Sequence, residues 1–327
     1  MDTRTLTSPL RPELDLSIVV PLFNEEESLP ELMAWIDQVL EGRNYEVVFV
    51  DDGSTDGSWE AVRRLKETFG DKVVGVSFAR NHGKSAALHT GFRLVRGRVV
   101  ITMDADLQDS PDEVPELERK VLEEGFDLVS GWKKKRYDPI TKTVPTKLYN
   151  WATRRVSGIH LHDFNCGLKA YRREVVRAVE VNGEMHRYIP VLAKQAGFHR
   201  IGERVVQHRA RKYGETKFGL ERFVNGFLDL LTIAFLGRFG HKPMHLFGVL
   251  GTLMFVGGFG LFGAIGGYKL WALSQDIEAK NIADISAFYV ALVCMVMGLQ
   301  LFLAGFLGEL VTRNAPGRNH YLLKDQV

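Results

Sequence analysis

The stretch Val99–Gln108 reads Val-Val-Ile-Thr-Met-Asp-Ala-Asp-Leu-Gln. Its first five residues are apolar or β-branched, a run that is typical of a buried strand. Two carboxylates, Asp104 and Asp106, follow where that strand would end, and neither has a helix to cap. Because open α/β sheets bind ligands at the carboxyl ends of their strands, this stretch predicts both a strand and a ligand site beside it.

The same alternation of apolar runs and helical patterns extends to both sides of this stretch. We predict strands at Leu16–Pro21, Tyr45–Val50, Val73–Phe78, Val99–Met103 and Asp127–Ser130. Helices are predicted from Ser28 to Leu40, Ser58 to Phe69 and Ser85 to Val95, after Ser110, and from Val144 to Val156. This order predicts an α/β fold with a mostly parallel sheet that helices cover on both faces.

Two of these helices begin with a capping signature. Ser28-Leu-Pro-Glu31 and Ser110-Pro-Asp-Glu113 each place a serine three residues before a glutamate, with proline between them. In a capping box, the serine hydroxyl accepts a hydrogen bond from a free backbone N–H of the first turn. We therefore expect both serines to cap their helices.

Composition excludes several classes of protein. The net charge of +2 over 327 residues is too small to argue for a nucleic-acid partner. Cys166 and Cys294 lie far apart, so no disulfide framework is expected and a reducing compartment fits better. The first 15 residues contain no apolar run and hence no secretory signal. We expect the first part of the chain to stay in the cytoplasm.

Apolar residues concentrate in the last quarter of the chain. Met244–Tyr268 and Ile285–Leu307 contain no Asp, Glu, Lys or Arg, and each exceeds the roughly 20 residues that cross a bilayer core. Two transmembrane helices are predicted, and a pair of buried core helices is the alternative. The first segment is rich in glycine, which predicts close helix–helix packing.

Charges around these segments predict their orientation. Basic residues precede the first segment and follow the second, whereas the loop between them holds Asp276, Glu278, Lys280 and Asp284. The positive-inside bias then places both chain ends in the cytoplasm and the loop outside. Leu220–Phe239 has an amphipathic pattern that predicts a helix on the membrane surface, with ordinary core packing as the alternative. The expected domains are residues 1–218, an interface helix at 219–243 and a two-span region at 244–327.

Acidic and amide side chains also follow two other predicted strands. Asn24 and Glu25 follow the first strand, and Asp51 and Asp52 end the second. The carboxylates of Asp104 and Asp106, two residues apart, are oxygen ligands whose spacing suits Mg²⁺ or Mn²⁺ bridging a diphosphate. A solvated turn is the alternative. Because an unpaired cluster of carboxylates repels itself, a cation or a nucleotide would relieve the strain.

These motifs resemble those of a known family. Pro21-x-x-Asn24-Glu25, Val50-Asp-Asp-Gly-Ser-Thr-Asp56, Asn81-x-Gly-Lys84 and Asp104-Ala-Asp-Leu-Gln108 resemble the family 2 glycosyltransferases, which have a nucleotide-diphospho-sugar transferase fold (GT-A, Rossmann-like). Asp163-Phe-Asn-Cys-Gly, Arg211-Lys-Tyr-Gly-Glu-Thr-Lys217 and the two apolar segments resemble the polyprenyl-phosphate sugar synthases. The resemblance covers about residues 16 to 315.

The resemblance implies roles for particular residues. Those expected to bind the nucleotide-sugar donor are Pro21, Asn24, Glu25, Asp52, Lys84, Asp104 and Arg136. Asp106 and Gln108, with Asp104, are expected to hold Mg²⁺ or Mn²⁺. For Arg136, a solvated loop charge is the alternative to a phosphate contact.

Three further residues are implied in the transfer itself. Arg211 and Lys217 are expected to bind phosphate oxygens, as charge-assisted hydrogen bonds favour. Asp163 matches the position usually assigned as catalytic base. The acceptor phosphate has a second pKa of about 6 and is mostly dianionic at neutral pH, so little proton removal is required. We therefore expect Asp163 to orient the acceptor, with holding a Lys or Arg, completing the metal site, or acting as a base as the alternatives.

The implied activity is inverting transfer of a single sugar. The donor would be a UDP- or GDP-hexose, and the acceptor a polyprenyl (undecaprenyl or dolichyl) phosphate. The expected location is the inner (plasma) membrane, as a multi-pass protein with its catalytic domain in the cytoplasm and an association into homo-oligomers such as tetramers. A processive polysaccharide synthase and a non-enzymatic membrane scaffold are the alternatives. The absence of Gln-x-x-Arg-Trp and the intact acidic motifs argue against them.

Overall fold

The structure, a computed structural model, describes residues 14–134, 140–183, 185–209, 212, 232, 235, 239, 242–278 and 280–314. The chain divides into two compact units, Met1–Leu231 and Thr232–Val327. This boundary falls within the segment that we predict as an interface helix, most of which lies outside the described residues. The three-part division of the chain stays a prediction.

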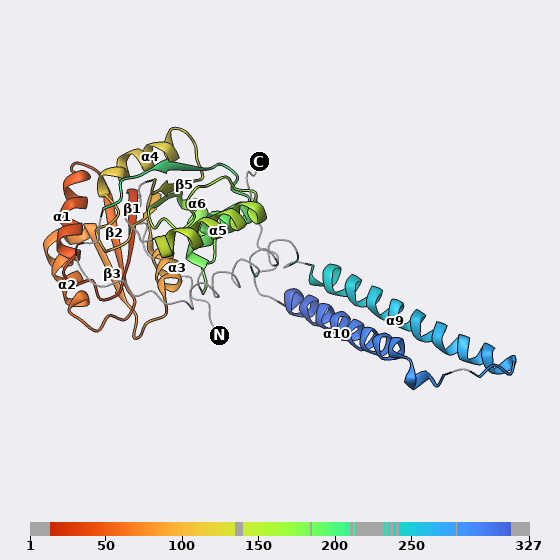
Figure 1. The fold of residues 1–327 in the computed structure, drawn as a ribbon. Helices are drawn as coiled ribbons and strands as arrows, with labels where there is room; N and C mark the ends of the chain where they lie inside the picture. Colours follow the sequence, from red (N-terminus) through yellow and green to blue (C-terminus); the bar gives the residue numbers. More distant parts are fainter. Residues whose placement is uncertain are drawn as a thin grey trace. The chain divides into compact units, whose positions relative to one another are not determined.

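A seven-stranded sheet forms the core of the first unit (Figure 1). Its strands are β1 (Leu14–Leu22), β2 (Tyr45–Asp51), β3 (Val73–Ser77), β4 (Gly97–Thr102), β5 (Leu128–Trp132), β6 (Lys169–Arg172) and β7 (Ile201–Val205). They lie in the order β3-β2-β1-β4-β6-β5-β7, and of these seven only β6 runs antiparallel to its neighbours. The mostly parallel sheet and the five predicted strands are confirmed.

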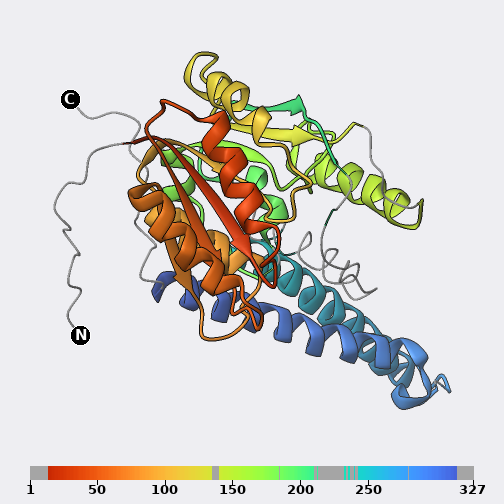
Figure 2. The same ribbon diagram turned by 90° about the vertical axis from the view of Figure 1, so that its left-hand side faces the viewer.

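Helices connect the strands and cover both faces of the sheet. They are α1 (Leu29–Val39), α2 (Ser58–Phe69), α3 (Lys84–Leu94), α4 (Val114–Leu122), α5 (Ile140–Ser157), α6 (Arg173–Ala178) and α7 (Ile189–Gln195), with short 3₁₀ turns at η1 (Gly70–Lys72), η2 (Pro111–Glu113) and η3 (Met185–Tyr188). Figure 2 shows α1 and α2 side by side over one face. All five predicted helices are confirmed, within a few residues at their ends.

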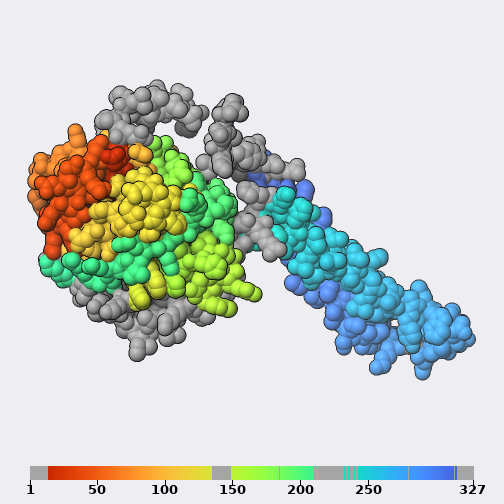
Figure 3. Space-filling model, turned by 90° about the horizontal axis from the view of Figure 1, so that it is seen from above, coloured from red at the N-terminus to blue at the C-terminus, as the bar shows by residue number. Residues whose placement is uncertain are grey.

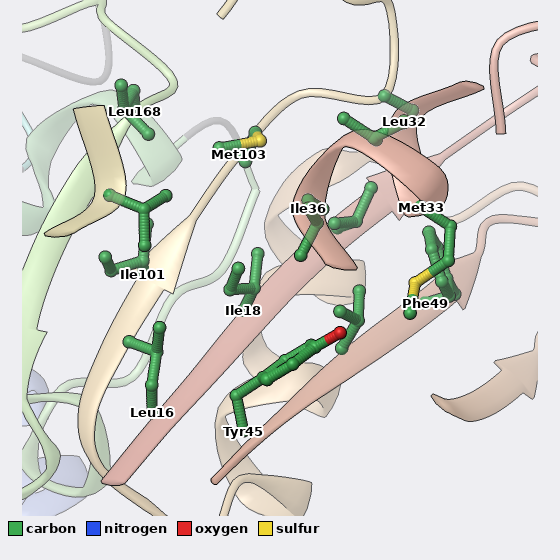
Figure 4. Packing of buried hydrophobic residues seen from close by; sticks show 14 of the residues in the cluster. Leu16, Ile18, Leu32, Met33, Ile36, Tyr45, Phe49, Ile101, Met103 and Leu168 are labelled. Atoms are coloured by element: carbon green, nitrogen blue, oxygen red, sulfur yellow. The ribbon is translucent and has the colours of Figure 1, made fainter. Parts of the chain in front are cut away.

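Two apolar layers hold these helices on the sheet. One layer joins α1, α2 and α4 to the strands, and the other joins α3, α6 and α7 to the opposite face. Figure 4 shows Met33 and Ile36 of α1 over Ile18 of β1 and Phe49 of β2. These four side chains are fully buried. Burying each such side chain contributes about 1.5–3 kcal/mol, so both layers hold the helices against the central strands.

The far edge of the sheet is held by charge as well as by apolar contact. Figure 3 shows α4, in yellow, beside β7, in green. Arg204 of β7 forms ion pairs with Glu116 of α4 at 2.9 Å and with Glu113 of η2 at 3.3 Å. Strand β7 was not predicted from the sequence because its five residues include Glu203 and Arg204 in place of an apolar run.

The predicted capping boxes are wrong. Neither Ser28 nor Ser110 makes a side-chain cap bond to its helix. The Ser28 hydroxyl donates instead to the carbonyl of Glu25 at 2.9 Å, and the Ser110 hydroxyl donates to Asp112 at 2.9 Å. Ser28 already has helical backbone angles (φ −87°, ψ −26°), whereas an N-cap residue is typically non-helical.

The second unit contains two long apolar helices, α9 (Pro243–Ser274) and α10 (Ser286–Asn314), with η4 (Ile282–Asp284) between them. Both are long and apolar enough to cross a membrane. Their outward side chains are largely exposed, for example Leu253 at 65% and Val311 at 72%. Such exposure does not fit a buried core pair and fits a pair that faces lipid.

Glycines explain part of the contact between α9 and α10. A Cβ on Gly251 would lie 2.6 Å from the carbonyl of Gly298, and one on Gly258 would lie 2.7 Å from that of Ala291. Gly257, Gly260, Gly263, Gly266 and Gly267 have nothing within 4 Å of such a Cβ. The predicted packing role is therefore confirmed for one face of α9 and does not apply to those five glycines.

Candidate active site

Most of the expected donor residues that the structure describes lie at or just after the carboxyl ends of β1, β2 and β4, and Lys84 begins α3. In the sheet, β1 lies between β2 and β4. The connection after β1 leads to β2 on one side, and the connection after β4 leads to β5 on the other side. Open sheets bind ligands at such a switch point. A narrow cavity at this point is lined by Pro21, Lys84, Thr102, Asp104 and Lys169, among others. Its volume is only about 20 Å³, close to that of one water molecule.

Asp104 is held by a lysine from the neighbouring helix. Lys84, the first residue of α3, forms an ion pair with the Asp104 carboxylate, and the two side chains are 34% and 31% exposed. Burial acts to raise the pKa of Asp104, but the charge and hydrogen bond of Lys84 outweigh it, so the pKa lies below its usual range. Asp104 is therefore a carboxylate with a cationic partner.

Gly167 makes room for that carboxylate. A Cβ at this position would lie 2.6 to 2.8 Å from both oxygens and the carboxyl carbon of Asp104. No side chain larger than hydrogen leaves the carboxylate where it is. The glycine of the Asp163-Phe-Asn-Cys-Gly segment thus forms one wall of the site, a role that sequence reasoning missed.

The turn after β4 carries a strained residue. Leu107 has a φ of +60°, a left-handed conformation that costs an ordinary residue about 1–3 kcal/mol and that clusters at functional sites. The turn places the Gln108 N–H 3.2 Å from Asp106, which is 8% exposed. The Gln108 side-chain amide donates to the carbonyl of Arg209 at 3.4 Å. These bonds fix the two predicted metal ligands in the turn.

A second lysine lies beneath this turn. Lys133 forms an ion pair with the fully buried Asp109 at 2.8 Å. Burial acts to lower the pKa of Lys133, but the charge of Asp109 outweighs it and raises the pKa above its usual range. Removing one partner of a buried ion pair strongly destabilises the folded protein, because the other charge stays buried without compensation. Lys133 therefore anchors the turn that carries Asp106.

Asp52 has a structural task that the sequence did not reveal. Its two carboxylate oxygens accept the backbone N–H groups of His82, at 2.7 Å, and Gly83, at 2.9 Å. Gly53, with a φ of +72°, lets the backbone of Arg80 approach, because a Cβ there would lie 2.5 Å from the Arg80 carbonyl carbon. Asp52 thus holds the loop that positions Lys84.

The end of β1 is tied to the end of β2 in a similar way. Asn24, with a φ of +57°, accepts the Thr55 N–H at 2.8 Å and donates its own N–H to Ser54 at 2.9 Å. The Glu25 N–H donates to Ser58 at 2.9 Å. These bonds bring the two predicted donor-binding residues beside the loop that follows β2.

Asp163 lies deeper than the sequence suggested. It is 1% exposed, accepts the Asn165 N–H at 3.0 Å and lies near Lys169, a buried lysine of β6. Lys169 donates to the Cys166 carbonyl, and burial lowers its pKa. A lysine in a buried strand is rare unless it is paired. A lysine beside apolar residues of a strand is therefore the sequence signal that could have identified Lys169 as a site residue.

The carboxylates fit part of a metal site. Asp104, Asp106 and the Gln108 amide offer the oxygen ligands that Mg²⁺ and Mn²⁺ prefer. Among the residues that the structure describes, no group of three or more His, Cys, Asp or Glu side chains could hold an ion alone. A diphosphate would have to supply further oxygens. Arg136, Arg211 and Lys217 lie outside the described residues.

Several known proteins are similar to this chain in sequence. Residues 17–179 match the family described as Glycosyl transferase family 2. The chain is 35% identical to the dodecaprenyl-phosphate galacturonate synthase of Rhizobium johnstonii, over 92% of this chain and 88% of that protein. It is 37% identical to the undecaprenyl-phosphate 4-deoxy-4-formamido-L-arabinose transferase of Pseudomonas aeruginosa, over 91% of this chain and 85% of that protein.

A solved structure shows the same fold at lower identity. Glucosyl-3-phosphoglycerate synthase from Mycobacterium tuberculosis, in complex with Mn²⁺, UDP-glucose and phosphoglyceric acid, superposes with a TM-score of 0.53. The two proteins are 20% identical, and the superposition covers 68% of this chain and 79% of the synthase chain. At this identity, the likeness concerns the fold alone. Together with the sheet described above, the identity to relatives along about nine-tenths of its length makes this chain a member of glycosyltransferase family 2.

Proposed function

We propose that this protein transfers one sugar from a nucleoside-diphosphate sugar to a polyprenyl phosphate at the cytoplasmic face of a membrane. The observation that carries the proposal is the identity, along about nine-tenths of the chain, to two transferases whose names specify polyprenyl-phosphate products or acceptors. The acidic strand ends at the switch point and the two apolar helices support it.

The reaction is a direct displacement. An oxygen of the acceptor phosphate attacks the anomeric carbon, the bond from that carbon to the diphosphate breaks, and the anomeric centre inverts. The nucleoside diphosphate leaves with the electron pair. Since the acceptor phosphate is mostly dianionic above its second pKa of about 6, the buried Asp163 has no proton to remove and orients the acceptor through its surroundings.

Cations must offset the repulsion between two anionic substrates. Asp104, Asp106 and Gln108 would hold Mg²⁺ or Mn²⁺, which supplies charge that stabilises the leaving diphosphate. Arg211 and Lys217 are our candidates for contacts to the remaining phosphate oxygens, as charge-assisted bonds require. Arg136 is a further candidate. We assign Pro21, Asn24, Glu25 and Asp52 to contacts with the nucleotide.

The membrane arrangement is also part of the proposal. Basic residues flank the pair α9 and α10, and the loop between them holds Asp276, Glu278 and Asp284. We propose that both chain ends face the cytoplasm of a plasma (inner) membrane. A cysteine in place of Lys280 should then react with an impermeant thiol reagent from outside the cell. Association into a homo-oligomer such as a tetramer stays a prediction.

Purified full-length protein in lipid nanodiscs provides the test. It would be incubated with radiolabelled UDP- and GDP-sugars, undecaprenyl or dolichyl phosphate, and Mg²⁺ or Mn²⁺. A lipid product that carries one sugar is expected, and Asp106→Asn should reduce its formation by orders of magnitude. Polymer would instead support a processive synthase. No transfer from any donor, by protein that is shown to be folded, would support a scaffold.

A further inference from the structure

We propose that Lys84 is an internal counter-ion for Asp104, and that it makes the binding of the divalent cation depend on the nucleoside diphosphate. Without the nucleotide, the ammonium group of Lys84 is paired with the Asp104 carboxylate, which the cation needs as a ligand. With the nucleotide, the diphosphate draws Lys84 away and completes the set of metal ligands. The inference rests on the metal-dependent transfer proposed above.

The first observation is the ion pair itself. Lys84 and Asp104 lie in the wall of the same cavity and are in contact. Gly167 backs the carboxylate so closely that a Cβ would lie 2.6 Å from it. The carboxylate therefore packs against the backbone at Gly167 while its charge is paired with Lys84.

The second observation is how Lys84 is placed. Asp52 accepts the N–H groups of His82 and Gly83, the two residues before Lys84. The backbone that leads into α3 is thus fixed at the end of β2. The side chain of Lys84 is about one-third exposed, so its flexible stem can move while this backbone stays in place.

The charge balance explains why the cation alone binds poorly. Two lysines beside the turn are already paired, Lys84 with Asp104 and Lys133 with the buried Asp109. A divalent cation at Asp104 would lie beside the ammonium of Lys84 and would be repelled by it. The described residues also provide no group of three acidic, His or Cys side chains that could hold the cation without other ligands.

A diphosphate reverses this balance. Its oxygens supply the metal ligands that the protein lacks, and its negative charge gives the ammonium of Lys84 a second partner. Lysine suits such an exchange because its charge is compact and its donors rotate freely. Lys84 would then contact the diphosphate while Asp104 faces the cation, so that nucleotide and cation strengthen each other's binding.

Mn²⁺ binding, measured by the loss of the free-ion electron paramagnetic resonance signal, tests the inference without a turnover assay. Full-length wild type, Lys84→Met and Lys84→Gln would be titrated with and without UDP or GDP. Lys72→Met is the matched control. Lys72 also forms an ion pair with an aspartate, Asp37, and both side chains are partly exposed, but the pair lies away from the site. In the wild type, the nucleotide should tighten Mn²⁺ binding by at least about tenfold.

Both Lys84 variants should bind Mn²⁺ without nucleotide about tenfold more tightly than the wild type, and should show a smaller effect of nucleotide. The Lys72 variant should match the wild type. If Mn²⁺ binds with nucleotide but the Lys84 variants gain no affinity without it, the counter-ion role is overturned and the proposed function stands. If no protein binds Mn²⁺ even with nucleotide, the metal requirement fails and this inference fails with it.

Discussion

Gly167→Ala tests how closely the Asp104 carboxylate must be held. The added Cβ would lie 2.6 Å from the nearest carboxylate oxygen, whereas ordinary contact begins at 3.4 Å. The carboxylate must therefore move by about 0.8 Å. Because Lys84 forms an ion pair with this carboxylate, the movement changes the ion pair as well as the ligand position.

The size of the effect follows from this displacement. Overpacking typically costs about 1–3 kcal/mol, and the partly exposed Asp104 favours the lower end of that range. For a unit of this size, that cost corresponds to a fall in Tm of a few degrees. A misplacement of about 1 Å can lower a rate by about 10²-fold. Transfer should therefore fall far more than stability does.

Two measurements separate these effects. Thermal unfolding gives the loss of stability, and transfer from the preferred nucleotide sugar gives the loss of rate. Gly202→Ala is the matched control, because its Cβ would lie 2.6 Å from the ring of Phe126 at the far edge of the sheet. This control should lose similar stability and keep most of its activity.

The reasoning would be refuted by a folded Gly167→Ala protein with wild-type transfer and wild-type nucleotide binding. Such a result would mean that Asp104 has another productive position. Equal losses of activity in the Gly167 and Gly202 variants would likewise show that general destabilisation, and not the position of the carboxylate, lowers the rate.

Three further predictions concern other parts of the site. Asp52→Asn removes one acceptor from the loop before α3, so exchange of the two amide hydrogens held there should speed up and nucleotide binding should weaken about tenfold; unchanged exchange would contradict this. Burial raises the pKa of the Cys166 thiol to about 12, so in a Cys294→Ser background a thiol reagent at pH 8 should modify it only after unfolding. Rapid labelling of the native protein would count against that. Asp163→Asn should slow transfer by a nearly constant factor between about pH 6 and 9, because the acceptor phosphate is already ionised; a loss that vanishes at high pH would make Asp163 a base.

Local pattern was enough for the elements whose residues decide their own structure. Tyr45–Asp51 is buried at every position and is apolar except for Glu46 and Asp51, a run that is typical of a parallel strand buried on both faces. The same holds for α9 and α10, whose length and composition predict membrane spans without knowledge of any contact. The acidic motifs at the strand ends could also be predicted from the sequence. Parallel strands bring their carboxyl ends to one edge of the sheet, so residues that follow such strands lie near one another.

The tertiary structure alone decided how those motif residues are used. The strand β6, Lys169–Arg172, has only four residues and carries charge at both ends, so no local pattern marks it. It is defined by pairing with β4 and β5, which lie about 70 and 40 residues earlier in the sequence. That pairing brings Gly167 against Asp104, just as the loop held by Asp52 brings Lys84 to it. Contacts between distant segments depend on the path of the whole chain, and for that reason the sequence identified the carboxylates but not their partners.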